Sequence, residues 1–334
     1  MLFFIAPGPH HPLNPITQHT HKMPIFDAKT FVETDSAPQV LIMTGAKERD
    51  STASIEVALN TGSFDTWLDI CPYDGAKDKK KMAYGSYHME ASSSGEPLDV
   101  CDPHGHCVTL SHDKYCADTA SAKKRNGDPF DVEKVDHDGL VGLACTTGKY
   151  AKHLGCSAFA EAKETFVYDR KADGSGQVCF SNPRGGDECQ PLRRHHGTTR
   201  VKLDTSTPVP VANGMILDTG SSATSQLPAG KTREIFGATC LVGFPDIKHL
   251  ELNYDQNYIE YVVDEEAVTA RCPVNRCVAH AKAQCQAPPE NHLTVKEIVE
   301  KMNNLDFQTQ NEEIKQCRKK EFNKCMVDAE REAT

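Results

Sequence analysis

Residues 57–68 read VALNTGSFDTWL, and residues 215–227 read MILDTGSSATSQL. In each stretch an apolar run ends in a short polar residue, Asn60 or Asp218, and Thr-Gly-Ser follows. A near-repeat at such long range indicates two copies of one supersecondary unit. We therefore expect the two stretches to fold in the same way.

Each stretch has the composition of a tight turn that follows a β-strand. Gly62 and Gly220 permit a crowded backbone, and hydroxyls such as those of Ser63 and Ser221 can hold a loop by hydrogen bonds. Two such loops facing each other would place two polar side chains at one point between two lobes.

This pair of loops resembles the pepsin-like aspartic peptidases (family A1), in which each lobe supplies one Asp-Thr-Gly-Ser/Thr loop. The resemblance implies an all-β, bilobal pepsin-like acid protease fold with Asp218 and Asn60 at the two catalytic positions. Residues 174–180 and 214–224 are most similar to the cysteine-rich, plant-type branch of the family.

Other segments follow in the order that the family has. Trp67 lies seven positions after Asn60, where the family has a tryptophan that bonds the tyrosine of the flap. Residues 84–86 resemble the start of that flap, and residues 138–144 resemble the segment beneath the first loop. The resemblance implies that the following residues contact substrate: Tyr84, Gly85, Trp67, Gly62, Ser63, Gly220 and Ser221.

Each signal alone also has an ordinary structural explanation. Many junctions between a strand and a turn use Asp-Thr-Gly-Ser, Tyr84 could be a loop residue, and Trp67 could belong to the core. The joint order of the segments over residues 40–272 favours the family.

Asn60 departs from the family pattern at a catalytic position. An amide does not ionise near neutral pH and cannot deliver a proton, although it can bind Asp218 or a water. Because each positioned acid-base group contributes about 100- to 10,000-fold in rate, we expect impaired hydrolysis. Asp65, Asp69 or a residue from a second copy could substitute, but the family normally has an aspartate at the position of Asp65 as well.

Three functions are compatible with these features, and the sequence leaves open whether the protein is an enzyme. The first is binding of a peptide or protein in an interlobe cleft without efficient hydrolysis. The second is an active aspartic-type endopeptidase. The third is an inhibitor-like binding module, as in plant-type relatives that resemble xylanase inhibitors. The presence of Tyr84, Trp67 and Asp218 favours a cleft that still fits a peptide.

Composition restricts the partners. The 334 residues carry a formal net charge of −10, which argues against nucleic acid or an anionic membrane surface. No stretch is long and apolar enough to cross a membrane. The histidines lack zinc-site spacing relative to the cysteines, so we expect no metal and no cofactor. We expect a monomer whose partner is a peptide or protein.

The 14 cysteines indicate disulfides and an oxidising compartment, and therefore a secreted or endomembrane-lumenal protein. The apolar run at residues 2–6 is too short for the core of a signal peptide, so the terminus does not itself indicate export.

The pattern predicts four regions: a flexible leader (1–35), an N-terminal β lobe (36–164), a C-terminal β lobe (165–272) and a helical tail (273–334). Capping boxes at 294–297 and 309–312 indicate helices in the tail. Residues 241–243 follow Asp218 too closely to be the segment beneath the second loop, so we expect a truncated second lobe. Strands are predicted at 40–43, 55–59, 139–143, 177–180, 215–217 and 258–263.

Two pairs of cysteines in the tail have equal spacing. Cys277 and Cys285 are eight residues apart, as are Cys317 and Cys325. Two antiparallel helices could align them as Cys277–Cys325 and Cys285–Cys317, because eight residues are a little over two helical turns. Four cysteines allow three pairings, and the spacing could be a coincidence.

Overall fold

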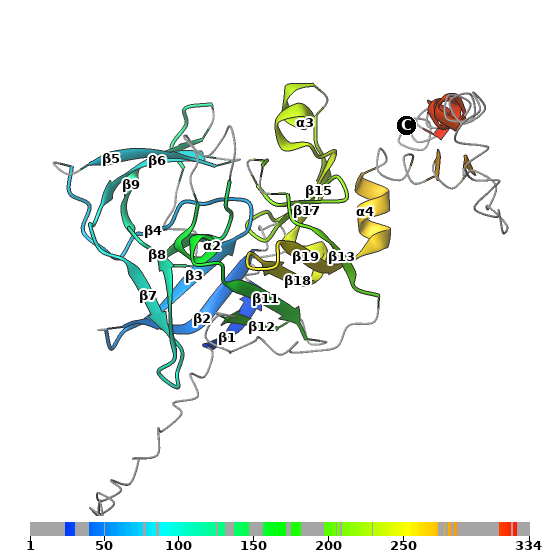
Figure 1. Ribbon diagram of the computed structural model, residues 1–334. Coiled ribbons are helices and arrows are strands. Elements are labelled where there is room, and N and C mark those ends of the chain that lie inside the picture. The colour runs from blue at the N-terminus through cyan, green and yellow to red at the C-terminus, as the bar shows by residue number, and fades with distance from the viewer. Residues whose placement is uncertain are drawn as a thin grey trace, which may run out of the picture.

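The computed structural model describes residues 24–30, 40–49, 51–75, 78–84, 87–124, 126–130, 137–146, 156–171, 175–181, 197–204, 206–207, 209–228, 230–272, 277, 280–281, 284–285, 314–321 and 323–325. These residues form a mostly-β protein with two sheets and a few short helices (Figure 1). Within this part of the chain, no helix is both long and apolar enough to cross a bilayer.

The larger sheet has 15 strands among the described residues. Its path runs β13-β19-β18-β11-β12-β1-β2-β3-β10-β4-β9-β6-β5, and the β7–β8 hairpin branches from β2. The strands are β1 (Ile25–Thr30), β2 (Leu41–Glu48), β3 (Ser54–Asn60), β4 (Trp67–Leu68), β5 (Lys79–Ala83), β6 (Tyr87–Ser93), β7 (Leu98–Cys101), β8 (Cys107–Ser111), β9 (Tyr115–Lys124), β10 (Gly139–Gly142), β11 (Thr165–Arg170), β12 (Gly176–Ser181), β13 (Thr199–Lys202), β18 (Ile247–Asn253) and β19 (Tyr258–Val263).

The smaller sheet has four strands in the order β14-β15-β17-β16. They are β14 (Val211–Ala212), β15 (Met215–Asp218), β16 (Ser225–Gln226) and β17 (Cys240–Gly243). The helices are α2 (Ala158–Glu161), α3 (Lys231–Phe236), α4 (Glu265–Arg271) and the 3-10 turn η4 (Phe244–Asp246). Each of the six strands predicted from the sequence is present.

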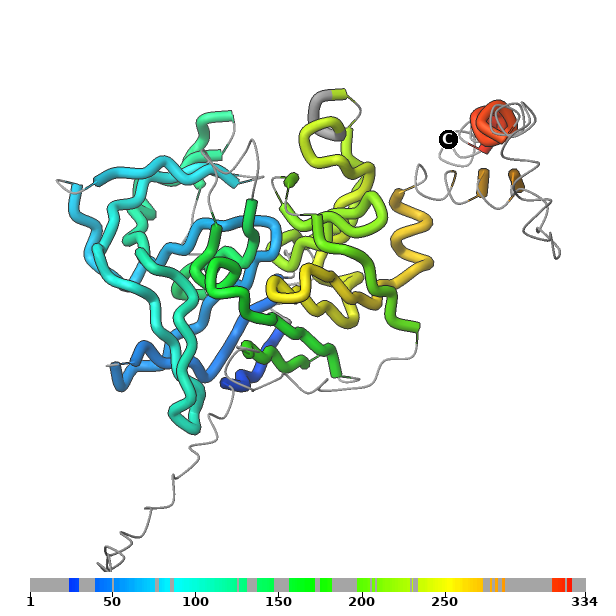
Figure 2. Tube along the Cα trace, viewed as in Figure 1, coloured from blue at the N-terminus to red at the C-terminus, as the bar shows by residue number. Residues whose placement is uncertain are grey.

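β1 joins the two predicted lobes. It pairs antiparallel with β12 on one side and with β2 on the other, so one sheet continues across the predicted boundary at residue 165 (Figures 1 and 2). The predicted leader is therefore wrong for residues 25–30. Phe26 and Ala28 are buried while Ile25 and Asp27 are exposed, which is the alternation of a strand with one face on the core.

A buried carboxylate fixes the start of β1. Asp102 accepts hydrogen bonds from the backbone amides of Ile25, His104 and His106, at 3.2, 2.8 and 2.9 Å, and contacts the His106 ring at 3.0 Å. Burial opposes the ionisation of Asp102, but these hydrogen bonds outweigh it and lower its pKa.

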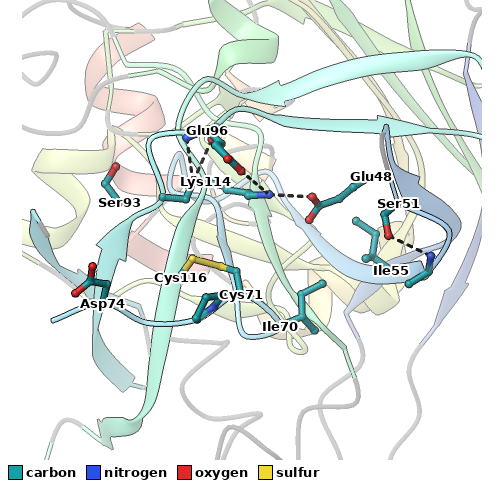
Figure 3. A pocket seen from close by; sticks show the side chains of 13 residues that line it. Glu48, Ser51, Ile55, Ile70, Cys71, Asp74, Ser93, Glu96, Lys114 and Cys116 are labelled. Atoms are coloured by element: carbon teal, nitrogen blue, oxygen red, sulfur yellow. Dashed lines mark hydrogen bonds and ion pairs between the residues drawn. A yellow bond between two sulfur atoms is a disulfide. The ribbon is translucent and has the colours of Figure 1, made fainter. Parts of the chain in front are cut away.

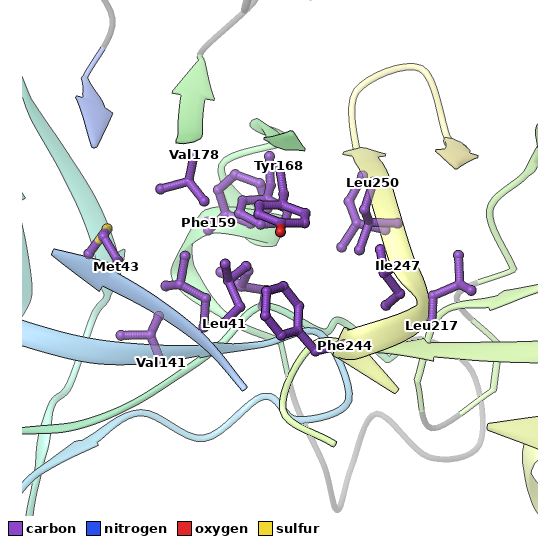
Figure 4. Packing of buried hydrophobic residues seen from close by; sticks show 14 of the residues in the cluster. Leu41, Met43, Val141, Phe159, Tyr168, Val178, Leu217, Phe244, Ile247 and Leu250 are labelled. Carbon is purple, nitrogen blue, oxygen red and sulfur yellow. The ribbon is translucent and has the colours of Figure 1, made fainter. Parts of the chain in front are cut away.

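One hydrophobic core spans both predicted lobes. Figure 4 shows side chains from β2 and β10 packed with side chains from β11, β12, β15 and β18. Aromatic rings interlock at its centre, where Phe159 packs edge-on against Phe180 at 5.5 Å and against Tyr254 at 5.8 Å. Burying one such ring contributes about 2–3 kcal/mol, so this core strongly opposes separation of the two halves.

The predicted disulfide-rich character is confirmed. The described residues form six complete bridges: Cys71–Cys116, Cys101–Cys107, Cys145–Cys156, Cys240–Cys272, Cys277–Cys325 and Cys285–Cys317. The last two are the bridges suggested by the equal spacing in the tail. Multiple disulfides are compatible with an oxidising secretory or lumenal location.

Helical structure begins before the predicted tail. Asp264 caps α4 by accepting a hydrogen bond from the Ala267 amide at 3.1 Å, so the helix starts at Glu265 and not after residue 273. Residues 314–321 and 323–325 are also helical. The two predicted capping boxes, at 294–297 and 309–312, lie outside the described residues.

Candidate functional site

Two equivalent loops follow two pairs of parallel strands. β3 is parallel to β10 with Asn60 beside Gly142, and β15 is parallel to β17 with Asp218 beside Gly243. A third strand completes each unit in the same way, because β4 pairs antiparallel with β10 and β16 pairs antiparallel with β17. The near-repeat in the sequence is therefore a repeat of structure.

The partner strands use glycine because the loops pass directly over them. A Cβ on Gly142 would lie 2.5 Å from the carbonyl carbon of Phe64, and one on Gly243 would lie 2.6 Å from that of Ala223. The expectation that residues 241–243 follow Asp218 too closely to lie beneath the second loop is wrong. The segment is present, and what differs is the insertion before it: β5–β9 lie between β4 and β10, but α3 is the one helix or strand described between β16 and β17.

Thr61 and Thr219 bind the two loops to each other. The Thr61 hydroxyl donates to the Leu217 carbonyl at 2.6 Å and accepts from the Thr219 amide at 3.1 Å. The Thr219 hydroxyl donates to the Leu59 carbonyl at 2.6 Å and accepts from the Thr61 amide at 3.1 Å. Both threonines are completely buried. This exchange fixes the distance and the orientation of one loop relative to the other.

Asn60 and Asp218 converge where the loops meet. The Gly62 amide donates to Asn60 Oδ1 at 2.7 Å, and the Gly220 amide donates to Asp218 Oδ1 at 2.9 Å. Each side chain also reaches the opposite glycine: a Cβ on Gly62 would lie 2.5 Å from the Asp218 carboxyl carbon, and a Cβ on Gly220 would lie 2.3 Å from the Asn60 amide carbon. The structure thus brings together four of the predicted site residues.

Burial controls the charge of Asp218. The surrounding protein raises its pKa to about 6, although the amides of Gly220 and Gly62 favour the ionised form. Asn60, which is only 7% exposed, brings no charge to the site. Asp218 is therefore a single carboxyl group that is mostly protonated below pH 6.

The two serines of the loops differ in their hydrogen bonding. Ser221 Oγ donates to the Ala223 carbonyl at 3.2 Å. Ser63 Oγ is buried and has no hydrogen-bond partner among the described residues. A buried hydroxyl without a partner is costly, and a bound ligand or water at the loop junction would satisfy it.

Tyr84 follows β5 at the turn into β6, where the flap is predicted. Its amide donates to the Tyr87 carbonyl at 2.8 Å, and its ring lies 5.0 Å from that of Tyr87. Tyr87 in turn stacks on Phe130 at 4.3 Å. Burial raises the pKa of Tyr84 well above its usual range, so its hydroxyl remains a hydrogen-bond donor. Gly85 lies outside the described residues.

Trp67 supports this turn from beneath. It is completely buried in a cluster with Met82 and Leu140, against which Tyr84 packs. Its indole N–H makes no well-formed hydrogen bond with the residues that the structure describes, but it lies close enough to Tyr84 to oppose, slightly, the rise of the tyrosine pKa. Trp67 therefore acts here as a packing residue under Tyr84.

The two aspartates considered as substitutes for a catalytic carboxylate have other surroundings. Asp65 forms an ion pair at 2.5 Å with Lys80 of β5. Lys80 also lies over the Tyr115 ring at 5.0 Å. It therefore connects the loop that follows β3 to β5 and β9. Asp69 lies at the surface, where partial desolvation of its carboxyl and the nearby carboxylate of Asp138 raise its pKa.

A separate pocket of about 430 Å³ was not foreseen from the sequence (Figure 3). It lies beside the Cys71–Cys116 bridge, and none of the predicted site residues lines it. Its buried Lys114 binds Glu48 at 2.8 Å and lies 3.7 Å from Glu96. Lys114 therefore compensates part of the negative charge of these two glutamates.

No protein-family model matches this chain, and no curated protein sequence matches it.

Proposed function

We propose that the chain is a pepsin-like aspartic peptidase fold in which Asn60 and Asp218 occupy the two catalytic positions. Its N-terminal and C-terminal lobes would be residues 36–164 and 165–272, extended by β1. The observation that supports this most strongly is the reciprocal hydrogen bonding of Thr61 and Thr219, because it joins two equivalent loops so that their polar side chains converge.

The proposed function is binding of a peptide or protein segment between the lobes, with impaired hydrolysis. Attack by water on a peptide bond needs one group that accepts a proton from the water and another that donates one to the carbonyl. Asp218 can perform one of these tasks at a time, and Asn60 can perform neither. Hydrolysis should therefore be slow even when a peptide is correctly bound.

The groups around the junction suit a peptide backbone. Asp218, when protonated, can donate to a carbonyl, and Asn60 can both donate and accept. Ser63 adds a buried hydroxyl in need of a partner. Because the pKa of Asp218 is about 6, binding that uses its proton should be stronger at acidic pH.

The short insertion between β16 and β17 makes the two halves unequal. The first half supplies the β5–β6 hairpin with Tyr84, whereas the second half has α3 in the corresponding place. We infer that the first half provides most of the contacts with the bound segment.

The decisive experiment compares the purified protein with its Asn60→Asp variant in the digestion of denatured globin between pH 3 and 6. We expect little pepstatin-sensitive cleavage by the unchanged protein and clear cleavage by Asn60→Asp, which the double variant Asn60→Asp/Asp218→Ala should lose. Circular dichroism controls for folding of each variant.

Other outcomes lead to different conclusions. Strong pepstatin-sensitive cleavage by the unchanged protein, abolished by Asp218→Ala, would establish the active endopeptidase and reject impaired hydrolysis. A folded but inactive Asn60→Asp variant that still binds pepstatin would show that the short second half, and not Asn60 alone, prevents catalysis. Absence of both cleavage and pepstatin binding in that variant would reject the proposed cleft.

A further inference from the structure

A second group of chemically reactive side chains lies on the β18–β19 hairpin. His249 and Glu251 are two residues apart on β18, so they project from the same face of the sheet. Glu260 on β19 stands directly opposite Glu251 in the register. A ring nitrogen of His249 and one carboxylate oxygen from each glutamate all lie within 4.8 Å of one another.

A neighbouring strand orients the histidine. Asp169 on β11 stands opposite His249, and its Oδ1 lies 2.5 Å from His249 Nδ1. The side chains of both residues are almost fully buried, at 5% and 3% exposed. A carboxylate that holds one ring nitrogen fixes the tautomer and the ring orientation, and it makes the other nitrogen a better metal ligand. A cation would therefore be bound through Nε2.

The two glutamates retain a capacity to bind a cation. Arg200 holds Glu260 through Oε2 at 2.7 Å, and the Tyr258 hydroxyl donates to Oε1 of Glu251. Each carboxylate has a second oxygen that can ligate a metal. Like charges directly opposite each other on paired strands are destabilising, and a cation between Glu251 and Glu260 would remove this repulsion.

Size and charge suit a divalent transition metal. Ligand atoms bound at about 2.0–2.2 Å to one tetrahedral zinc ion lie roughly 3.4 Å apart. Ligand atoms at the 4.8 Å limit must therefore approach one another by about 1.4 Å, which side-chain rotations allow. Three carboxylates, those of Asp169, Glu251 and Glu260, against the single guanidinium of Arg200 leave an excess of negative charge.

We propose that His249, Glu251 and Glu260 form a Zn²⁺ site, with Asp169 as the residue that positions His249. Imidazole together with carboxylates is a ligand set found in zinc proteins, and three protein ligands leave a position for water. The site joins β18 to β19, and it is independent of the loops that carry Asn60 and Asp218.

The test is titration of the chelator-treated full-length protein with ZnCl₂ by isothermal calorimetry. We expect one zinc ion per chain at a site that Glu251→Gln and Glu260→Gln each weaken at least about tenfold, in line with the cost of losing a metal-site partner. Asp169→Asn should weaken it by about 10- to 100-fold while leaving the stoichiometry unchanged. His112→Asn is the matched control, because His112 forms an exposed histidine–glutamate pair with Glu161.

The glutamate variants keep the proposal testable even if Asp169→Asn does not fold, because both glutamates are only partly buried. Zinc binding that is unchanged in the Glu251→Gln/Glu260→Gln double variant would overturn the proposal. The absence of zinc binding by the unchanged protein would also overturn it. So would a loss of zinc binding in His112→Asn when the glutamate variants still bind zinc.

Discussion

Thr61 and Thr219 exchange four hydrogen bonds across the junction of the two loops, each hydroxyl donating to the carbonyl that precedes the other loop and accepting from the other threonine's amide. The two loops therefore depend on each other for their shape. Asn60 and Asp218 are held in place by this exchange, since each directly precedes one of the threonines.

Replacing Thr61 or Thr219 by valine should lower the free energy of unfolding by about 1–3 kcal/mol, because the nearly isosteric change leaves a buried carbonyl and a buried amide without partners. Urea denaturation measures this loss. Thr66→Val is the matched control, since Thr66 is 2% exposed and its hydroxyl has no hydrogen-bond partner in the described part of the chain. An equal loss of stability in Thr66→Val would show that the hydrogen bonds are not the cause.

Gly62→Ala and Gly220→Ala should disrupt the site. The new methyl groups would lie within 2.6 Å of the Asp218 carboxyl carbon or the Asn60 amide carbon, so these side chains must move. We expect a loss of about 1–3 kcal/mol in stability from overpacking, with loss of pepstatin binding in the Asn60→Asp background. Gly75→Ala is the control, because its methyl group would have ordinary contacts at 3.5 Å or more. Normal binding by Gly62→Ala would contradict the observed convergence.

The raised pKa of Asp218 predicts a stability change with a definite sign. Well below pH 4 the carboxyl is protonated in both the folded and the unfolded state, so it has no effect on stability. Between about pH 4 and 6 the unfolded chain releases the proton while the folded chain keeps it, and stability falls by at most roughly 3 kcal/mol. The loss should be smaller than this limit because Asp218 retains partial access to water.

Asp218→Asn should remove this pH-dependent loss. The difference in the free energy of unfolding, Asp218→Asn minus the unchanged protein, should be more favourable to the variant at pH 7.5 than at pH 3.5. Urea denaturation of both proteins at both pH values measures it. Asp102 has a lowered pKa, so it makes both proteins more stable as the pH rises. Taking the difference between the two proteins cancels this contribution. Asp78→Asn, a change at an exposed carboxylate, is the control. A difference that does not change with pH would show that Asp218 titrates normally.

The local features of the two loops could be predicted from the sequence. The repeated Thr-Gly-Ser placed the ends of β3 and β15, because a strand that runs into a crowded turn needs glycine. The mutual hydrogen bonding of Thr61 and Thr219 could not be derived in detail, since it depends on how two distant segments are brought together. The pepsin-like assignment as a whole remains a proposal.

Two predictions from the sequence are wrong, one based on the distance between Asp218 and Gly243 and one based on the composition of the first 35 residues. The short separation of Gly243 from Asp218 argues against a glycine segment beneath the second loop, yet strand pairing depends on the register of β15 and β17 and not on the length of the insertion. β1 could not be predicted because its alternating residues lie in a segment dominated by proline and histidine. His249, Glu251 and Glu260 showed no local motif, because their proximity arises from the pairing of β18 with β19.

The two bridges of the tail give a prediction that peptide mapping can check without any variant. Digestion under non-reducing conditions should release one linked pair of peptides with Cys277 and Cys325 and another with Cys285 and Cys317. In the chain-entropy account, loops of this length stabilise the folded tail by roughly 3–4 kcal/mol each. Cys285→Ser/Cys317→Ser should therefore make the tail much more sensitive to protease, while the Cys240–Cys272 bridge remains intact. A Cys277–Cys285 link, or alkylation of all four thiols without a reductant, would contradict the antiparallel pairing.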